Sequence, residues 1–262
     1  MKHWIFLGCS WLIGGAASAP KPSDNHRAAN KPPAKAATTA KTAAKASAPA
    51  KAATNTPAAP QNSDRQEVDQ LVADIQAYYD RMDDYTADFV QSYTRVALSR
   101  TSESRGLLML KKPGMMRWAY QSPAPKLWIA DGKQLFVYDE EEGQVFIDRD
   151  FEMSKLSNSV SFLWGQGKLT DSFNVSLAKA TMFGAPAKAK ALELIPKQDA
   201  TYARLILIVA PTGGEVTESI LFETSGNKNH FRFTNAKLNT GLKVENFRFT
   251  PPPGVEVIHR SP

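Results

Sequence analysis

The chain has 262 residues, of which 42% are hydrophobic, so it is long enough to bury one large core or two small ones. Its formal net charge of +6 is unevenly distributed, because residues 1–63 hold eight of the 32 Lys and Arg but one of the 26 Asp and Glu. From Asp64 onward 24 basic and 25 acidic side chains remain, a net charge of −1. This balance argues against a nucleic-acid-binding protein, which needs basic side chains clustered on its folded surface.

Residues 1–19 have the pattern of an export signal peptide. A basic residue precedes the apolar stretch Trp4–Gly15, and Ala17-Ser18-Ala19 forms an A-x-A cleavage site. Cleavage after Ala17 is an alternative, because Pro20 disfavours a cut directly before it. An uncleaved membrane anchor is a second alternative, although the apolar stretch is short for a membrane span. Cleavage would remove the single cysteine, so the exported protein would contain no disulfide.

Residues 20–63 are expected to form a disordered linker. The segment is rich in Ala, Lys and Pro and contains no aromatic residue, so it cannot bury enough apolar surface to offset the entropy of ordering. Its prolines and like charges should keep it extended. It could serve as a tether, as an arm that associates with the cell wall, or simply as a solvated leader.

A helix is expected where the linker ends. Ser63 or Asp64 can cap its first turn. Apolar residues then recur at helical spacing and form one stripe: Val68, Leu71, Val72, Ile75, Tyr79 and Met82. The spacing predicts a single helix that ends at Asp83-Asp84 and packs on a core.

After Tyr85 the apolar residues alternate with a period of two, which predicts strands. The first group of predicted strands comprises Tyr85–Leu98, Ser104–Lys112, Met115–Gln121, Lys126–Ala130, Gln134–Tyr138 and Gln144–Asp148. The second group comprises Asp171–Leu177, Lys190–Pro196, Arg204–Ala210, Glu215–Glu223, His230–Leu238 and Lys243–Phe249. Between the groups, the apolar segment 151–168 predicts two short helices.

These elements predict a mainly β fold. Strands joined by such short connections pair antiparallel, because a parallel pair needs a long crossover. We therefore expect one long antiparallel sheet that curls, with a helix before it and helical pieces that cover its open side.

The chain lacks the residue patterns of an enzyme or a metal site. After residue 63 the histidines are His230 and His259, which lie far apart in sequence and have no third ligand at metal spacing. A nucleophile elbow, a phosphate loop and a dinucleotide fingerprint are all absent from the sequence. The acidic run 139–142 is typical of a solvated hairpin turn rather than a calcium site. We therefore expect no catalysis, no metal and no cofactor.

Several predicted strands are apolar on both faces, most clearly in segments 106–110, 115–120, 127–129 and 135–138. A sheet that is covered on one face shows clean alternation of apolar and polar residues. Either both faces are covered, as in a plain barrel or sandwich core, or one face lines a cavity for an apolar ligand. Met and Trp, which are abundant here, suit an adaptable apolar site.

Four segments together resemble one known family. Residues 106–118 are GLLMLKKPGMMRW, which is similar to the pattern G-x-L-x-[hydrophobic]-K-[RK]-P-x-x-[hydrophobic]-x-W. Residues 85–91, YTADFVQ, and 129–139, IADGKQLFVYD, are similar to the family's FxAxFxQ strand and its SDGKxLWxYD segment. Residues 247–257, FRFTPPPGVEV, are similar to its FxFxPPxGVxV ending. In this order and spacing, they resemble the LolA-type outer-membrane lipoprotein carriers.

The resemblance implies a LolA-like lipid-binding domain over residues 64–262, with an unclosed antiparallel β-barrel and a helical lid. It also implies a periplasmic carrier. Such a carrier receives acylated lipoproteins from an inner-membrane ABC release complex, shelters their acyl chains and delivers them to an outer-membrane acceptor. Exposing an acyl chain to water costs about 0.8 kcal/mol per CH₂, so the carrier must bury the chains reversibly. It needs no covalent step and no cofactor, and we expect it to act as a monomer.

Three departures from the family pattern leave other functions open. Lys112 stands where the family has an arginine that contacts the lid, and lysine lacks the forked donors of arginine. The linker 20–63 and the Ala/Lys-rich segment around residues 183–186 are not typical of the family. The chain could instead carry another lipid, such as a glycolipid or a sterol-like molecule, or be a sensor or interaction domain that carries nothing.

We expect the acyl chains to lie against one apolar face that includes lid residues. The expected lipid-binding residues are Phe89, Leu108, Leu110, Met116, Trp118, Phe136, Phe162 and Leu163. By alternation Lys112 shares this face with Leu108 and Leu110, so its ammonium needs polar partners. Free carbonyl groups at the ends of the short lid helices are the expected partners, and Lys112 would then control lid opening. The alternative is a lysine that extends along the rim without a partner.

Overall fold

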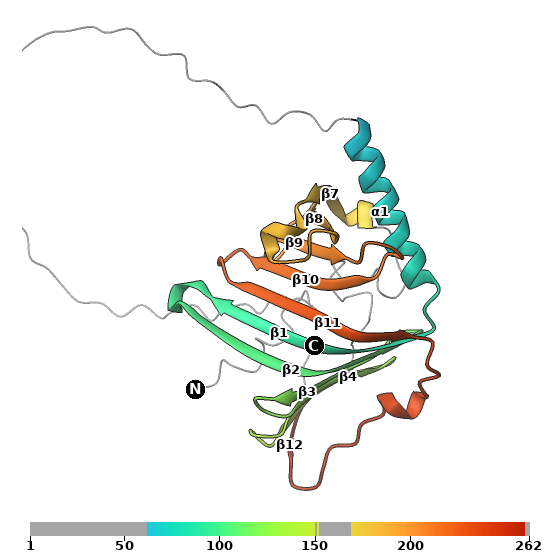
Figure 1. The fold of residues 1–262 in the computed structure, drawn as a ribbon. Helices are drawn as coiled ribbons and strands as arrows, with labels where there is room; N and C mark the ends of the chain where they lie inside the picture. The colour runs from blue at the N-terminus through green and yellow to red at the C-terminus, as the bar shows by residue number, and fades with distance from the viewer. Residues whose placement is uncertain (1–61, 150, 152–168, 260–262) are drawn as a thin grey trace, which may run out of the picture. The chain divides into compact units, whose positions relative to one another are not determined.

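The computed structural model describes residues 62–149, 151 and 169–259, which belong to one compact unit (Figure 1). The predicted signal peptide, nearly all of the predicted linker and nearly all of segment 151–168 lie outside the described residues. The predicted lid residues Phe162 and Leu163 lie outside them as well. Across the described ranges, we find no helix with the length and apolar character needed to span a membrane.

The predicted N-terminal helix is confirmed as α1, which spans Asn62–Asp80. Its apolar stripe is buried, since Leu71, Ile75 and Tyr79 are each at most 2% exposed. The helix ends a few residues earlier than the sequence pattern suggests. The chain leaves it because the backbone N–H of Asp83 donates instead to the side-chain oxygen of Asn239, at 2.7 Å.

The described part of the chain contains twelve strands and several short helical turns. The strands are β1 (Asp84–Arg95), β2 (Arg100–Lys111), β3 (Met115–Ser122), β4 (Lys126–Asp131), β5 (Leu135–Asp139), β6 (Gln144–Asp148), β7 (Phe173–Ala178), β8 (Lys190–Pro196), β9 (Tyr202–Val209), β10 (Val216–Glu223), β11 (Lys228–Leu238) and β12 (Glu256–His259). The helical turns are η1 (Val96–Leu98), α3 (Leu169–Ser172), η4 (Ala180–Phe183) and η5 (Val244–Phe247). Eleven of the twelve predicted strands are therefore confirmed, with small shifts at their ends.

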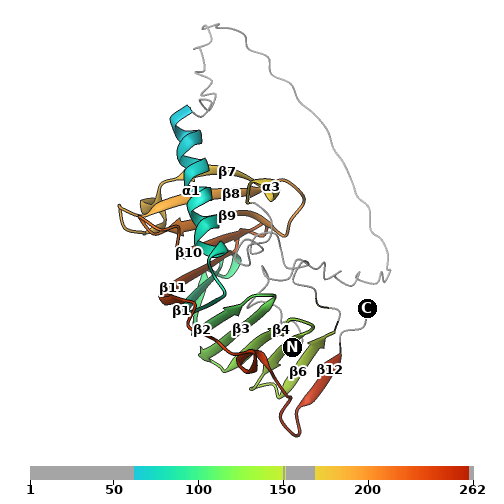
Figure 2. The ribbon, with the colours of Figure 1, turned by 90° about the vertical axis from the view of Figure 1, so that its right-hand side faces the viewer.

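The strands form one unclosed sheet in the order β12-β6-β5-β4-β3-β2-β1-β11-β10-β9-β8-β7. The pairing of β1 with β11 joins the two predicted groups of strands in the middle of the sheet. Neighbouring strands from β6 through to β7 pair antiparallel, as expected from their short connections. Figures 1 and 2 show how the sheet curves between its two edges.

The C-terminal segment corrects the sequence analysis. The predicted strand Lys243–Phe249 is wrong, because this segment contains the 3₁₀ turn η5. The chain instead crosses to the far edge of the sheet, where β12 pairs parallel with β6. Its first contact is between the backbone N–H of Glu256 and the carbonyl oxygen of Gly143, at 2.9 Å. The long connection after β11 is what allows a parallel pair.

The two faces of the sheet carry separate hydrophobic clusters. One face and α1 form the inner-face cluster, whose members include Leu71, Ile75, Tyr79, Tyr85, Ala87, Phe89, Leu108, Leu110, Met116, Trp118, Tyr120, Trp128, Ala130, Leu135, Val137, Leu205, Leu207, Leu221 and Phe231. The opposite face carries two smaller outer clusters. The outer cluster of β4–β6 consists of Ile129, Phe136, Val145 and Ile147. The other contains Ala180, Ala185, Ala191, Ile206, Ile208 and Ile220.

Helix α1 lies against the inner face where β7 to β10 form the sheet (Figure 2). The turn between β9 and β10 touches its backbone at Gly214, which has a φ of +78°. A Cβ atom added there would collide with the carbonyl of Asp74 in α1. A glycine is therefore needed for both the turn and the close approach of the helix.

Candidate functional site

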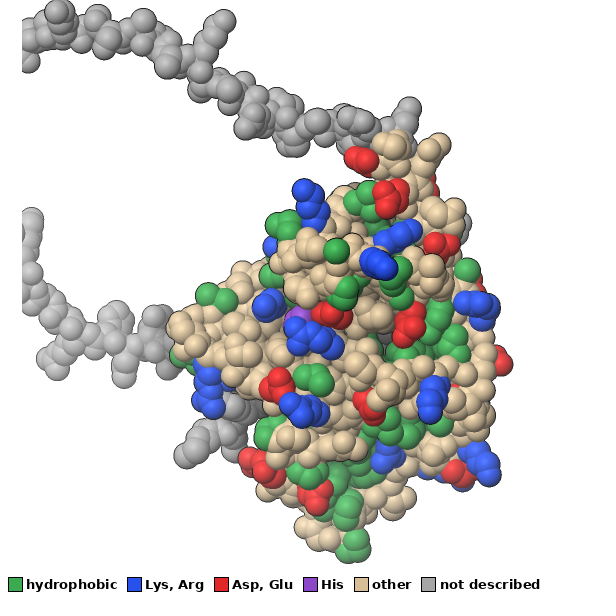
Figure 3. Space-filling view, viewed as in Figure 1, with side chains coloured by type: hydrophobic (Ala, Val, Ile, Leu, Met, Phe, Trp, Pro, Cys, Tyr) green, Lys and Arg blue, Asp and Glu red, His purple; other side chains and the backbone are tan. Residues whose placement is uncertain are grey.

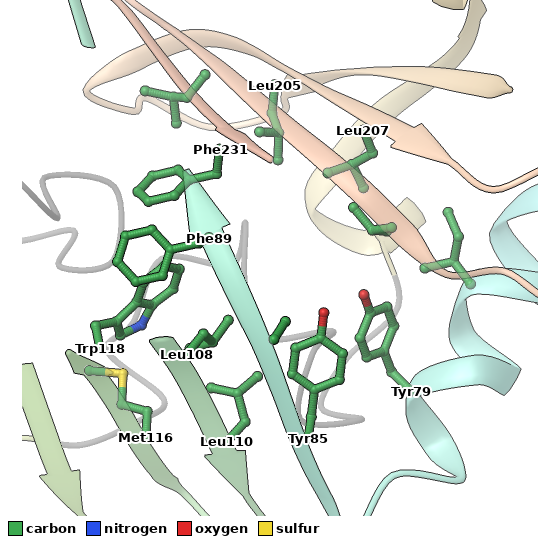
Figure 4. Packing of buried hydrophobic residues seen from close by; sticks show 14 of the residues in the cluster. Tyr79, Tyr85, Phe89, Leu108, Leu110, Met116, Trp118, Leu205, Leu207 and Phe231 are labelled. Atoms are coloured by element: carbon green, nitrogen blue, oxygen red, sulfur yellow. The ribbon is translucent and has the colours of Figure 1, made fainter. Parts of the chain in front are cut away.

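The structure brings five of the predicted lipid-binding residues together on the inner face (Figure 4). They are Phe89, Leu108, Leu110, Met116 and Trp118, and each is at most 2% exposed. The ring centroids of Phe89 and Trp118 lie 5.1 Å apart in an edge-to-face arrangement. Alternation within adjacent strands accounts for this, since Leu108 pairs with Trp118 and Leu110 pairs with Met116 across β2 and β3.

Gly106 makes room for the aromatic centre of this face. It lies between Phe89 on β1 and Tyr120 on β3 in the sheet register. A Cβ atom at Gly106 would collide with the carbonyl oxygen of Ala119 and lie 2.7 Å from Cζ of Phe89. The first glycine of the family-like segment is thus a packing requirement, because the Phe89 ring lies over it.

The second half of the chain supplies inner-face residues that the sequence analysis did not include among the site residues. The ring of Phe231 on β11 lies 5.2 Å from that of Trp118 and stacks on Phe233, at 6.2 Å. Leu205 and Leu207 of β9 belong to the same cluster (Figure 4). In the sequence, the alternation of aromatic and polar residues from His230 to Phe233 already indicates that Phe231 and Phe233 share one face of a strand. Only the pairing of β11 with β1 shows that this is the inner face.

Phe136 does not share this face, so that part of the prediction is wrong. It pairs with Ile129 across β4 and β5 and belongs to the outer cluster of β4–β6. Its ring lies 5.5 Å from that of Phe249, in the C-terminal segment. Val137, the next residue, faces inward instead. Both faces of β5 are apolar, so alternation could not decide which one faced the site.

Lys112 has carbonyl partners, but at a different helix from the one expected. Its Nζ donates to the carbonyl oxygens of Tyr79 and Asp80, at 2.8 and 3.4 Å. These groups belong to the last turn of α1, where carbonyls have no partner within the helix. A positive charge at this end also interacts favourably with the helix dipole. Lys112 thus connects the end of β2 to the C-terminal end of α1 by hydrogen bonds.

A buried carboxylate strengthens the same corner, and the sequence analysis gave no sign of it. Asp84, 2% exposed, accepts hydrogen bonds from Thr240 N and Oγ1 and from the backbone N–H groups of Gly241 and Leu242, at 2.7 to 3.0 Å. Burial alone raises the pKa of the Asp84 carboxyl, but these donors outweigh it and hold the pKa below its ordinary value. The corner where α1, β1 and β11 meet is therefore fixed by ionic hydrogen bonds.

The inner face also carries polar groups at the far end of β1. The amide of Gln91 donates to Asn229, at 2.9 Å, and both side chains are buried. Tyr93 donates to the carboxylate of Glu223, at 3.0 Å. Burial, followed by the charge of Glu223, raises the pKa of Tyr93 to about 12, so its phenol stays protonated and uncharged at neutral pH. In the described ranges no three metal-binding side chains gather at one place.

Charged side chains on the surface are mixed in sign. On the face shown in Figure 3, Lys and Arg alternate with Asp and Glu over the strands. Several of them pair, as Arg204 does with Glu193 at 2.7 Å and Arg232 with Glu218 at 3.4 Å. The face shown in Figure 3 therefore carries no patch of a single charge, and the apolar inner face is the candidate ligand site.

A long unclosed antiparallel sheet with a continuous apolar inner face defines a class of proteins that can enclose an apolar ligand. The chain belongs to the LolA family, described as "Outer membrane lipoprotein carrier protein LolA", whose profile matches residues 80–250. This match includes the five inner-face residues and Lys112.

Two sequence relatives agree with this assignment. An outer-membrane lipoprotein carrier protein of Nitrosomonas europaea is 26% identical over 187 residues, which cover 71% of this chain and 88% of the relative. One of Chromobacterium violaceum is 29% identical over 189 residues, covering 71% and 86%. Among solved structures, an uncharacterized conserved protein of Thermus thermophilus aligns with a TM-score of 0.48 and 12% identity, covering 74% of this chain and 100% of that one.

Proposed function

We propose that this chain is a periplasmic carrier that binds the acyl chains of lipoproteins and moves them from the inner to the outer membrane. It is exported by the signal of residues 1–19 and loaded by an inner-membrane ABC release complex. An outer-membrane acceptor receives the cargo. The carrier acts as a monomer, and neither a catalytic residue nor a cofactor takes part. Membership of the family and the names of the relatives support this proposal.

The observation that carries the proposal is the extent of the inner-face cluster. It runs from β7 through β11 and β1 to β5 and is built mostly from Leu, Met, Phe, Trp and Tyr side chains. These side chains are buried here, so loading has to replace protein contacts with acyl contacts. Exchanging one apolar contact for another changes the free energy little, whereas acyl chains leaving water gain about 0.8 kcal/mol per CH₂. Loading can therefore be favourable and still reversible.

A photocrosslinking experiment tests where the acyl chains bind. Phe233 and Phe222 are both half-buried, but Phe233 packs on the inner-face cluster and Phe222 on the outer cluster of Ala191 and Ile220. Each is replaced in turn by benzoylphenylalanine, and the protein is irradiated with a radiolabelled diacylglyceryl lipopeptide. Because both positions hold an aromatic ring of similar exposure, they form a matched pair.

We expect label to attach to the protein at position 233 and not at position 222. Equal labelling at both positions would mean that the lipopeptide adheres without using the inner face. No labelling at either position would favour a sensor or interaction domain that carries no lipid.

A further inference from the structure

Two buried tryptophans on the inner face have unused hydrogen-bond donors. Trp118 is 2% exposed and Trp128 is 1% exposed. Within the described part of the chain, the indole N–H groups of both residues lack a hydrogen-bond partner. The hydroxyl of Ser219 on β10 is the third unpartnered buried side-chain group there, but a hydroxyl can rotate to find a partner and an indole cannot.

The two indoles lie side by side in the sheet. Trp118 on β3 and Trp128 on β4 are direct cross-strand partners, and both belong to the inner-face cluster. Their neighbours on this face are apolar: Leu108 pairs with Trp118 on one side and Val137 pairs with Trp128 on the other. The backbone groups of these strands are engaged in the sheet ladder. The protein thus holds two adjacent donors among apolar side chains.

This arrangement is costly unless a ligand uses it. A buried N–H without an acceptor loses its hydrogen bonds to water, and buried tryptophans usually place this group near a partner. An apolar side chain without a donor, such as Phe89 or Leu110 nearby, does not carry that cost. Two such donors in adjacent positions therefore indicate an acceptor that arrives with the ligand.

The chemistry of an acylated cargo supplies this acceptor. The hydrocarbon part of an acyl chain has no hydrogen-bond acceptor, but the ester that joins each chain to glycerol has a carbonyl oxygen, which accepts hydrogen bonds. We propose that Trp118 and Trp128 donate hydrogen bonds to the ester carbonyl oxygens of a diacylated lipid. This inference rests on the proposed function. It adds that the site holds the acyl chains at a fixed depth and prefers chains joined by esters to chains joined without a carbonyl group.

The test compares two diacylglyceryl lipopeptides that differ only in their chain linkage. One has palmitoyl esters and the other has hexadecyl ethers, which lack the carbonyl oxygens. Each probe is partitioned between phosphatidylcholine vesicles and the mature protein, and the soluble complex is quantified. The variants are Trp118→Phe and Trp128→Phe, with Tyr138→Phe as the matched control. Tyr138 also loses a donor and keeps its ring, but it packs on the outer cluster of β4–β6.

We expect the wild type to prefer the ester over the ether by roughly two- to tenfold per hydrogen bond. Each Trp variant should lower this preference, and the double variant should abolish it. The lost ring volume affects both probes equally, so the ester-to-ether ratio reports the N–H group alone. The Tyr138→Phe variant should keep the wild-type ratio.

Equal binding of both probes to the wild type overturns the inference and leaves the carrier function standing. An ester preference that survives in the double variant also overturns it, because the donors then lie elsewhere. If neither probe enters a soluble complex, the proposed function itself fails and the inference fails with it.

Discussion

The ammonium group of Lys112, at the end of β2, donates a 2.8 Å hydrogen bond to the backbone carbonyl oxygen of Tyr79 in the last turn of α1. The backbone N–H of Lys112 also donates to the carbonyl oxygen of Asp83, at 2.9 Å. One residue thus connects the sheet to the helix that lies against the inner face. Any movement of the end of α1 during loading has to break the contacts of its side chain.

Replacing Lys112 should loosen this end of α1. Lys112→Leu removes the ammonium that donates to the carbonyl oxygens of Tyr79 and Asp80, while Lys112→Arg retains a donor and should tighten the contact. Amide hydrogen exchange at Met82, whose N–H bonds to Tyr79 O, should accelerate in the Leu variant. Transfer of lipoprotein from carrier to outer-membrane vesicles should slow in the Leu variant, with little change in overall stability.

Lys111→Leu is the control for this effect, because Lys111 is the last residue of β2, directly before Lys112, and its ammonium is not the donor to these carbonyl oxygens of α1. If the Lys112 and Lys111 variants show the same exchange and the same transfer rate, Lys112 has no gating role. The resemblance to the family would then hold for the fold and not for this part of the mechanism.

The Asp84 carboxylate should make stability depend on pH in the acidic range. Its pKa in the folded state lies below its value in the unfolded chain, so its contribution is fully present above about pH 4 and is lost as pH falls through the folded-state pKa. Asp84→Asn should lower the free energy of unfolding at pH 7 by about 1–3 kcal/mol. Urea denaturation at pH 7 and near pH 3 measures the free energy of unfolding of both proteins. The difference in this free energy between the variant and the wild type should be smaller near pH 3.

Asp83→Asn serves as the control, because Asp83 is the neighbouring acid and is exposed. This substitution should change the free energy of unfolding by no more than about 0.5 kcal/mol at both pH values. If Asp84→Asn lowers the free energy of unfolding equally near pH 3 and at pH 7, then packing of the side chain, and not its ionised carboxylate, accounts for the stabilisation.

Gly106→Ala should destabilise the domain through the aromatic centre of the inner face. The added Cβ collides with the backbone at Ala119 and with the ring of Phe89, so β2 or the ring has to shift, at a cost of about 1–3 kcal/mol. Gly143→Ala is the comparison: it has a φ of +62° but open space around the new Cβ, so it costs only backbone strain of about 1 kcal/mol. Thermal unfolding should therefore show the larger loss at Gly106, and an equal or smaller loss there would contradict this packing.

The predicted linker, residues 20–63, is expected to be dispensable for folding. Their composition cannot support a core, and the inner-face cluster begins within α1 with Val68 and Leu71. A chain that begins at Ser63 should unfold at the same temperature as one that begins at Pro20, as measured by circular dichroism. A melting temperature lower by many degrees would mean that the linker packs on the domain.

The sequence predicts most of this fold because each strand shows its own alternation of apolar and polar residues. Period-two alternation placed β1 to β6 within a few residues, and the grouping of Leu108 with Trp118 followed from it. The sequence could not show which segments far apart in the chain pair with each other. Alternation in β5 allowed either face, and only its pairing with Ile129 puts Phe136 on the outside. Likewise, nothing local to the C-terminal segment indicated that β12 pairs with β6 rather than β11.

The polar contacts of the site were equally hard to predict. The need of Lys112 for carbonyl partners follows from alternation, but the choice of α1 depends on how the helix lies on the sheet. The hydrogen bonds between Asp84 and the chain after β11 join residues more than 150 positions apart. No spacing rule covers such a contact.

Whether the inner face carries the acyl chains of lipoproteins can be tested by identifying what the protein carries in its own periplasm. The full mature chain is purified from that compartment without detergent, and its complexes are analysed by native mass spectrometry with lipid and peptide sequencing of the released ligand. We expect cysteine-linked diacyl or triacyl peptides from lipoproteins, at one per protein. Recovery of a glycolipid or sterol-like molecule in their place, or of protein that carries no lipid, would contradict it.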